Sequence, residues 1–274
     1  MEKKYAIAAN LRNFMSQVGR QSLYHYYLWH FKGKEPPLKL FILSHMRSGS
    51  SLLTHILNTN PEVLGFGETF TQYSSEKDFY QLMAEVHFTL RQFRVSETYL
   101  LDKILHDRIH GHGLINNSDI LKSDKTFVIF LIREPESSLA SMLKLMQNLN
   151  QEKALDYYTG RLLSLENYAK LIDKKERCFL LTYDQLCHQT ESVLKRLQEF
   201  LNVQHAFSEQ YQILRTTGRK YVGDPSSKIQ AGKIMKNNKN ADISILPNVI
   251  EKATKAFNQC YASLSDYCLM IDSE

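Results

Sequence analysis

A short apolar segment in this chain is followed directly by residues that could bind an anion. Arg47, Ser48, Gly49, Ser50 and Ser51 follow the apolar residues 38–43. The first N–H groups of a helix are unpaired and lie at the positive end of its dipole, so a tight turn entering a helix can bind an anion. Arg47 adds a guanidinium fork that can contact two anion oxygens. The turn therefore predicts a phosphate-type anion site, and we expect Ser50 or Ser51 to cap the helix. The alternative is an ordinary capped helix with a surface arginine.

Two further segments carry charged or hydroxyl side chains where strands should end. Glu68 follows the apolar residues 63–66, Arg133 follows residues 126–132, and Ser141 lies eight residues beyond Arg133. Ligands of open α/β sheets gather at the carboxyl ends of the strands, so we expect Glu68 near the anion turn, and Arg133 with Ser141 on one ligand. The alternatives are an exposed loop glutamate, and a helix-end salt bridge beside a surface serine.

Three histidines, His106, His110 and His112, stand close together in the sequence. They share no helical register and have no cysteine nearby, which favours a loop at the mouth of the substrate site over a metal site. The four cysteines show no C-x-x-C spacing, which favours reduced thiols over a disulfide framework. We therefore expect no bound metal.

The elements that position these residues follow from hydrophobic periodicity. Buried strands are predicted at residues 38–43, 63–66, 99–105, 126–132 and 178–182. Helical spacing is found at residues 23–31, 79–93, 151–173, 193–201 and 249–257, and after Ser50 and Pro135, whereas residues 218–232 show no period and predict a loop. Strands that alternate with helices predict one α/β domain with a parallel sheet. We expect residues 1–37 to form a helical lead-in and residues 38–274 to form the domain.

Composition limits the classes of function. The chain has 274 residues, 43% of them hydrophobic, and a formal net charge of +5. The positive charges form no long run, so they agree with an anionic ligand and do not predict nucleic-acid binding. No apolar run approaches the ~20 residues of a transmembrane helix, and the apolar patch after Lys4 is too short for a signal peptide, so we expect a cytoplasmic protein. Residues 1–37 should pack on the domain; the alternative is contact with a membrane surface or with a second copy in a homodimer.

Four segments together resemble one family, the sulfotransferases that use 3′-phosphoadenosine 5′-phosphosulfate (PAPS). Residues 47–52 resemble its 5′-phosphosulfate loop, and residues 130–133 with Ser141 resemble its 3′-phosphate motif. Residues 181–186 resemble the strand-to-helix segment beside the adenine, and residues 223–228 resemble the late loop that closes on the 3′-phosphate. Their order and spacing, between about residues 38 and 234, carry the resemblance. Bacterial and cyanobacterial members, including tailoring enzymes of secondary metabolites, are the most similar.

The resemblance implies a P-loop-like, three-layer α/β/α fold around a central, mainly parallel sheet of about four or five strands. It also implies ligands for the nucleotide. Arg47 would hold the 5′-phosphosulfate with Ser48, Gly49, Ser50 and Ser51, and Tyr183 would lie beside the adenine. Arg133 and Ser141 would bind the 3′-phosphate with Ser226, Ser227 and Lys228.

Catalytic residues are implied in the same way. Glu68 resembles the glutamate base of tyrosylprotein sulfotransferases, and Lys103 matches their lysine near the transferred group. The cytosolic phenol and steroid enzymes depart from this chain, because they have lysine at the position of Arg47 and an adenine-stacking tryptophan at that of Leu52, which we count among the nucleotide-binding residues. Their histidine base has no match here, so their acceptor preferences are not transferred.

The predicted function is transfer of a sulfuryl group from PAPS to a hydroxyl or amine of a small-molecule acceptor, without a metal. One alternative is an ATP-dependent kinase of the P-loop type. Its loop needs G-x-x-x-x-G-K-[ST], and the only Gly-Lys pairs, at residues 33–34 and 232–233, do not fit. The other alternative is a non-catalytic nucleotide-binding protein.

Overall fold

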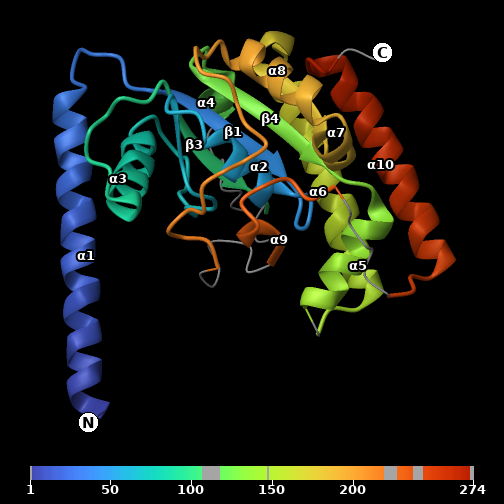
Figure 1. Cartoon of the computed structure of the whole chain (residues 1–274), viewed down its shortest axis with the longest axis horizontal. Coiled ribbons are helices and arrows are strands. Elements are labelled where there is room, and N and C mark those ends of the chain that lie inside the picture. Colours follow the sequence, from blue (N-terminus) through green and yellow to red (C-terminus); the bar gives the residue numbers. More distant parts are fainter. Residues whose placement is uncertain (1, 107–117, 147, 219–226, 237–242, 272–274) are drawn as a thin grey trace.

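A central sheet of five parallel strands organises the molecule, which we describe from a computed structural model (Figure 1). The structure describes residues 2–106, 118–146, 148–218, 227–236 and 243–271. The strands are β1 (Leu38–Ser44), β2 (Val63–Leu64), β3 (Tyr99–Ile104), β4 (Thr126–Ile132) and β5 (Cys178–Thr182). Their order in the sheet is β2-β3-β1-β4-β5, and each neighbouring pair is parallel. All five predicted strands are confirmed.

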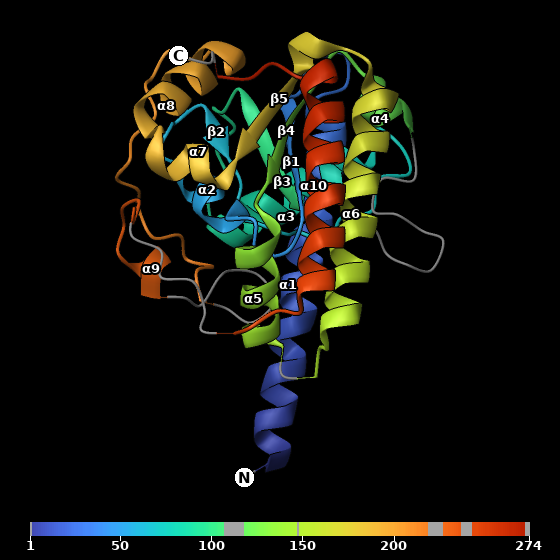
Figure 2. The ribbon, with the colours of Figure 1, turned by 90° about the vertical axis from the view of Figure 1, so that its right-hand side faces the viewer.

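Helices cover both faces of this sheet, as Figure 2 shows. One face packs against α3 (Asp78–Leu90), α4 (Ser118–Lys122), α5 (Pro135–Leu145), α6 (Gln151–Ile172) and α10 (Pro247–Tyr267), with α1 (Glu2–His30) outside α3. The other packs against α2 (Ser50–Leu57), α7 (Tyr183–His188) and α8 (Thr190–Leu201). The short elements η1 (Lys175–Arg177) and α9 (Ser227–Gln230) complete the set. This arrangement confirms the predicted three-layer α/β/α fold.

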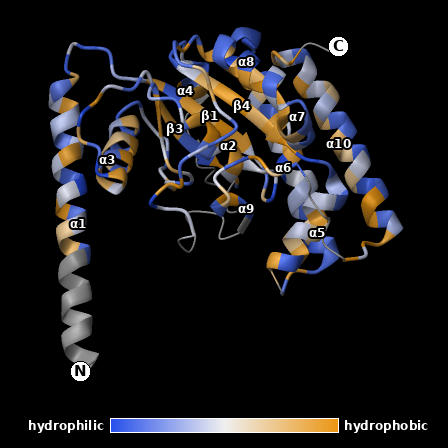
Figure 3. Cartoon of the chain, in the orientation of Figure 1, coloured by the Kyte–Doolittle hydropathy of each residue, from blue (hydrophilic) through white to orange (hydrophobic). Residues whose placement is uncertain are grey.

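The strands are mostly apolar because both of their faces are buried, and Figure 3 shows them mostly in the hydrophobic colour. Along β1, Leu40 and Ile42 pack with α2 and α8, whereas Phe41 and Leu43 pack on the opposite side. The register brings three strand ends to one edge, since Leu43 is paired with both Ile104 of β3 and Phe130 of β4. The polar residues that follow these strands therefore meet there.

Several helices differ from the prediction, and α4 was not predicted at all. Helix α1 begins at Glu2, far before the predicted residues 23–31, and it packs along α3. Helix α7 gave no periodic signal because six residues are too few, and only the resemblance implied a strand-to-helix segment there; Thr182 and Gln185 form a capping box that starts it directly after β5. The prediction of a loop throughout residues 218–232 is wrong at its end, where α9 forms one turn around the buried Ile229.

Within the ranges described above, no helix combines the length and the apolar character required to cross a membrane.

Candidate functional site

The turn between β1 and α2 has an unusual backbone. Arg47 has φ 63° and Gly49 has φ 93°, both in the left-handed region, where a residue with a side chain is strained by roughly 1–2 kcal/mol. Gly49 is the N-cap of α2 and provides no side-chain hydrogen bond, so the prediction that Ser50 or Ser51 caps this helix is wrong. The first N–H groups of α2 therefore receive no hydrogen bond from an N-cap side chain, which suits an anion site.

Gly49 lies against the ring of Tyr183 at the start of α7. A Cβ atom added to Gly49 would lie 2.2 Å from Cδ2 of Tyr183, so only glycine fits. The guanidinium carbon of Arg133 lies 4.2 Å from the centroid of the same ring, within the range of a cation–π contact. Three segments that sequence analysis assigned to one nucleotide therefore pack directly on one another.

Hydrogen bonds connect the same segments. Arg47 Nε donates to Ser141 Oγ of α5 at 2.8 Å, and Arg133 Nη1 donates to the carbonyl oxygen of Arg47 at 3.2 Å. The buried hydroxyl of Ser48 and the buried Nε of Arg133 make no hydrogen bond within the described part of the chain, although Nε of Arg133 forms an ion pair with Oε1 of Glu134 at 3.5 Å. Buried polar atoms of this kind are costly unless a ligand or solvent pairs with them. Their position fits an anion held between the Arg47 turn and Arg133.

His45 links the end of β1 to the end of β4, and sequence analysis did not single it out. Its Nδ1 lies 2.8 Å from the carbonyl oxygen of Met46, and its Nε2 accepts the backbone N–H of Arg133 at 3.0 Å. Only the neutral Nδ1–H tautomer satisfies both contacts. Burial lowers the pKa of His45 to about 4, with a smaller contribution from Arg161 and Arg133. The fully buried imidazole thus positions the two arginine-bearing turns relative to each other.

Lys103, on the strand next to β1, contacts the turn, and Glu68 lies close enough to Lys103 for their charges to interact. Lys103 Nζ donates to Ser51 Oγ at 3.2 Å, because β3 ends next to β1. Glu68 is half-buried, and burial raises the pKa of its carboxyl. The charges of Lys103 and Arg161 and the backbone N–H of Leu105 act in the opposite direction, so they favour the carboxylate. A carboxylate whose pKa is raised by burial can accept a proton more readily than an ordinary one.

Asp102 fixes the segment that carries Glu68. Its Oδ1 accepts the backbone N–H of Thr69 at 3.1 Å and that of Lys103 at 2.9 Å, and its Oδ2 accepts the hydroxyl of Tyr73 at 2.7 Å. Burial raises the pKa of Asp102 to about 6. The position of Glu68 therefore depends on a neighbouring residue that the motifs did not identify.

Sequence analysis also did not identify Arg161 of α6 as a site residue. Its Nε donates to the carbonyl oxygen of Ser44 at 2.9 Å, and its Nη2 donates to that of Ile104 at 2.8 Å. It thereby pairs with the last carbonyl groups of β1 and β3 and places a positive charge near Glu68. The sequence could have indicated it, because Arg161 stands at helical spacing between Tyr158 and Leu165 and so lies on the buried face of α6.

The remaining predicted residues lie elsewhere or outside the described ranges. Leu52 packs in the core between the sheet, α2 and α8, while Lys228 is exposed on α9, which Ser227 begins. Ser226, His110 and His112 lie outside the described residues, whereas His106 has its ring centroid 5.4 Å from that of Tyr157. In the part of the chain that is described, no group of three or more histidine, cysteine or acidic side chains could hold a metal.

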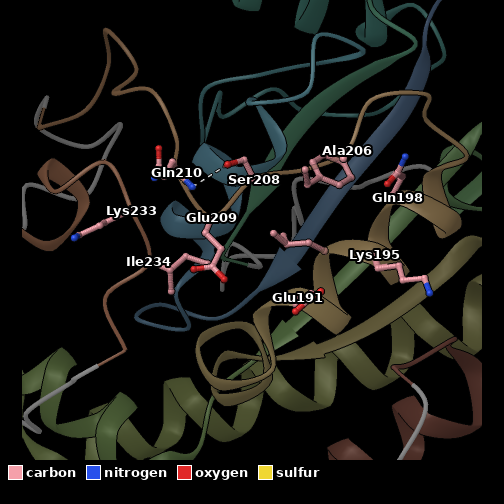
Figure 4. Close-up of a pocket in the computed structure, with 11 residues that line it drawn as sticks. Glu191, Lys195, Gln198, Ala206, Ser208, Glu209, Gln210, Lys233 and Ile234 are labelled. Carbon is pink, nitrogen blue, oxygen red and sulfur yellow. Dashed lines mark hydrogen bonds between the residues drawn. The ribbon is translucent and has the colours of Figure 1, made fainter.

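A surface pocket of about 560 Å³ lies away from these residues (Figure 4). It is lined by α8 residues, such as Glu191 and Lys195, and by two loop segments at residues 206–210 and 233–234. Figure 4 shows Ser208 accepting the backbone N–H of Gln210, at 3.1 Å, on its rim. None of the predicted site residues lines it, so it is not the candidate site.

Comparison with known proteins gives one family and several related folds. The family model described as "Sulfotransferase domain" matches residues 37–219, which is more than half of the chain. Among solved structures, the sulfotransferase domain from the curacin biosynthetic pathway superposes with a TM-score of 0.58 at 18% identity, covering 83% of this chain and 98% of its own. The sulfotransferase domain of the Synechococcus PCC 7002 olefin synthase gives 0.55 at 18% identity, covering 82% and 96%. No curated protein sequence gives a significant match.

Proposed function

Since the chain belongs to the sulfotransferase domain family, we propose that it transfers a sulfuryl group from PAPS to a hydroxyl or amine of a small-molecule acceptor. The products would be PAP (3′-phosphoadenosine 5′-phosphate) and a sulfated acceptor. The observation that carries this proposal is the contact of Arg47 with Ser141 and of Arg133 with the Arg47 backbone, around the unpaired hydroxyl of Ser48. Two arginines at adjoining strand ends suit a nucleotide with separate 5′ and 3′ anionic groups.

Each anionic group has a set of residues that would hold it. Arg47, the Ser48 hydroxyl and the first turn of α2 would hold the 5′-phosphosulfate. Arg133 and Ser141 would hold the 3′-phosphate, assisted by Lys228 and its neighbours in the late segment. The ring of Tyr183, already stacked with Arg133, supplies an aromatic surface on the adenine side.

PAPS would supply the sulfuryl group, and the residues of this chain would accept the proton and stabilise the developing charge. Glu68 would take the proton from the acceptor as its oxygen or nitrogen bonds to sulfur and the bond from sulfur to the phosphate oxygen breaks. Arg47 and Lys103 would stabilise the negative charge that gathers on that oxygen. A sulfuryl group carries less negative charge than a phosphoryl group, so we expect these cations and the turn N–H groups to suffice without a metal.

The context of the reaction is part of the same proposal. The four cysteines are buried free thiols, which fits a reducing compartment, so we propose a cytoplasmic location. We propose a secondary metabolite as the acceptor, on the resemblance of the motifs to tailoring enzymes.

Glu68→Gln tests the proposed base. The variant should retain PAP affinity and lose about 10²- to 10⁴-fold in turnover, measured as PAP release from PAPS with a panel of hydroxyl and amine acceptors. Glu199→Gln, at a carboxylate on α8, is the matched control and should leave both quantities unchanged. Turnover close to wild type in Glu68→Gln would refute the assignment.

A further inference from the structure

Helix α1 has a second apolar face that stays exposed in the part of the chain that the structure describes. Its inner face is buried, with Tyr27 and Phe31 in the core beside α3. Five large apolar side chains on its other side are exposed: Phe14 (63%), Met15 (64%), Val18 (47%), Tyr26 (46%) and Trp29 (73%). At 3.6 residues per turn these five lie within an arc of about 120°. We refer to them as the outer stripe.

The docking of α1 on α3 fixes the direction of the outer stripe. A Cβ atom added to Gly19 would lie 2.5 Å from the ring of Phe88, so the two helices approach closely there. Arg20 pairs with Glu85, and its guanidinium carbon lies 4.7 Å from the centroid of the Phe88 ring. In Figure 1, α1 lies at the edge of the molecule, with α3 between it and the sheet. The outer stripe therefore faces away from the domain.

The charge of the chain is concentrated in the same segment. Residues 1–36 contain six lysines and arginines and two glutamates, a formal net charge of +4 out of the +5 of the whole chain. The exposed Lys32 and Lys34 follow directly after the stripe. A positive segment beside an apolar stripe is complementary to a membrane surface, whose anionic headgroups lie above an apolar interior.

We propose that the outer stripe of α1 docks on an anionic membrane surface. The helix would lie in the plane of the interface, with Tyr26 and Trp29 at the level of the headgroups and Lys32 and Lys34 on lipid phosphates. Pairing with a second copy is less well supported. Two such positive segments would repel each other, and five side chains are few beside the roughly 20–30 residues per partner of a stable interface.

Trp29 is the only tryptophan of the chain, so its fluorescence reports directly on the stripe. With the full chain and phosphatidylcholine vesicles containing phosphatidylglycerol, we expect a blue shift of its emission and quenching by brominated lipid. Pure phosphatidylcholine vesicles should give a much smaller effect, and added salt should weaken binding to the anionic ones.

Matched variants then distinguish binding through the outer stripe from nonspecific adsorption to vesicles. In co-sedimentation with the same anionic vesicles, Met15→Ser and Val18→Ser should each bind roughly tenfold more weakly or worse than wild type. Leu163→Ser replaces a leucine of similar exposure, 53%, on α6 and should bind like wild type. The proposal would be overturned by an unchanged Trp29 emission, by equal binding to neutral vesicles, or by wild-type binding of the stripe variants. Sedimentation equilibrium that shows a stripe-dependent dimer without lipid would overturn it as well.

Discussion

The buried imidazole of His45 should make the stability of the protein depend on pH. Its neutral form donates to the Met46 carbonyl and accepts from the Arg133 N–H, so protonation would break the second contact. Burial lowers the pKa of His45 to about 4 in the folded protein, from 6.5. The unfolded chain therefore binds this proton at a higher pH than the folded one, and the stability due to His45 is complete above about pH 6.5 and is lost as the pH falls towards 4.

The size of this loss follows from the two pKa values. Each unit of difference corresponds to about 1.4 kcal/mol, so the full loss below pH 4 is roughly 3 kcal/mol. At pH 5, relative to pH 7.5, the expected loss is about 2 kcal/mol, because the titration is then only partly complete.

Urea unfolding at pH 7.5 and at pH 5.0 measures this difference, with His45→Gln as the comparison. Glutamine offers a donor and an acceptor but does not titrate, so the pH-dependent loss in the variant should be smaller than in wild type by about 2 kcal/mol. Other titrating groups contribute equally to both proteins. An NMR titration of His45 in the wild type gives the same information if the variant does not fold. Equal pH-dependent losses, or an imidazole pKa near 6.5, would refute the reasoning.

Substitutions at Arg133, Gly49 and Asp102 test the site further. Arg133→Ala should weaken PAP binding about 10- to 100-fold in calorimetric titration, and Arg133→Lys should recover part of it; an unchanged Kd would contradict the 3′-phosphate role. Gly49→Ala should lower stability by at least about 1–2 kcal/mol, because of its φ and its contact with Tyr183, and Gly49→Ala/Tyr183→Ala should recover part of the loss in urea unfolding. Asp102→Ala leaves two N–H groups and the Tyr73 hydroxyl without their acceptor, so stability should fall by about 3 kcal/mol or more, and a loss below 1 kcal/mol would show that Asp102 does not hold the Glu68 segment.

The sheet could be predicted from the sequence because its physical signal is local. A strand buried on both faces must be apolar at nearly every position, and the runs at β1, β4 and β5 meet that condition. The end of such a run also marks the sheet edge where a ligand binds, which is why Arg47 and Arg133 could be assigned to one site. The structure brings these two arginines and Ser141 into contact, while their roles in binding stay predictions.

The supporting residues could not be predicted, because their contacts join segments far apart in the chain. His45 meets Arg133 and Arg161 meets Ser44 only once the sheet has formed, and neither residue belongs to a recognisable motif. Helix α1 was underestimated, since the prediction covered only the aromatic residues 23–31 and not the turns from Glu2 onward. The positions of His45 and Arg161 therefore depend on tertiary contacts, which local sequence patterns do not show.

Titration of the protein with PAP tests the central claim most directly. The account predicts heat of binding at a single site and a rise of Tm with PAP concentration, both strongly reduced in Arg47→Ala, and no comparable stabilisation by ATP with Mg²⁺. If PAP gave neither heat nor protection from unfolding, or if ATP with Mg²⁺ stabilised the protein in its place, the assignment of the Arg47 turn to a sulfated adenylate would be contradicted.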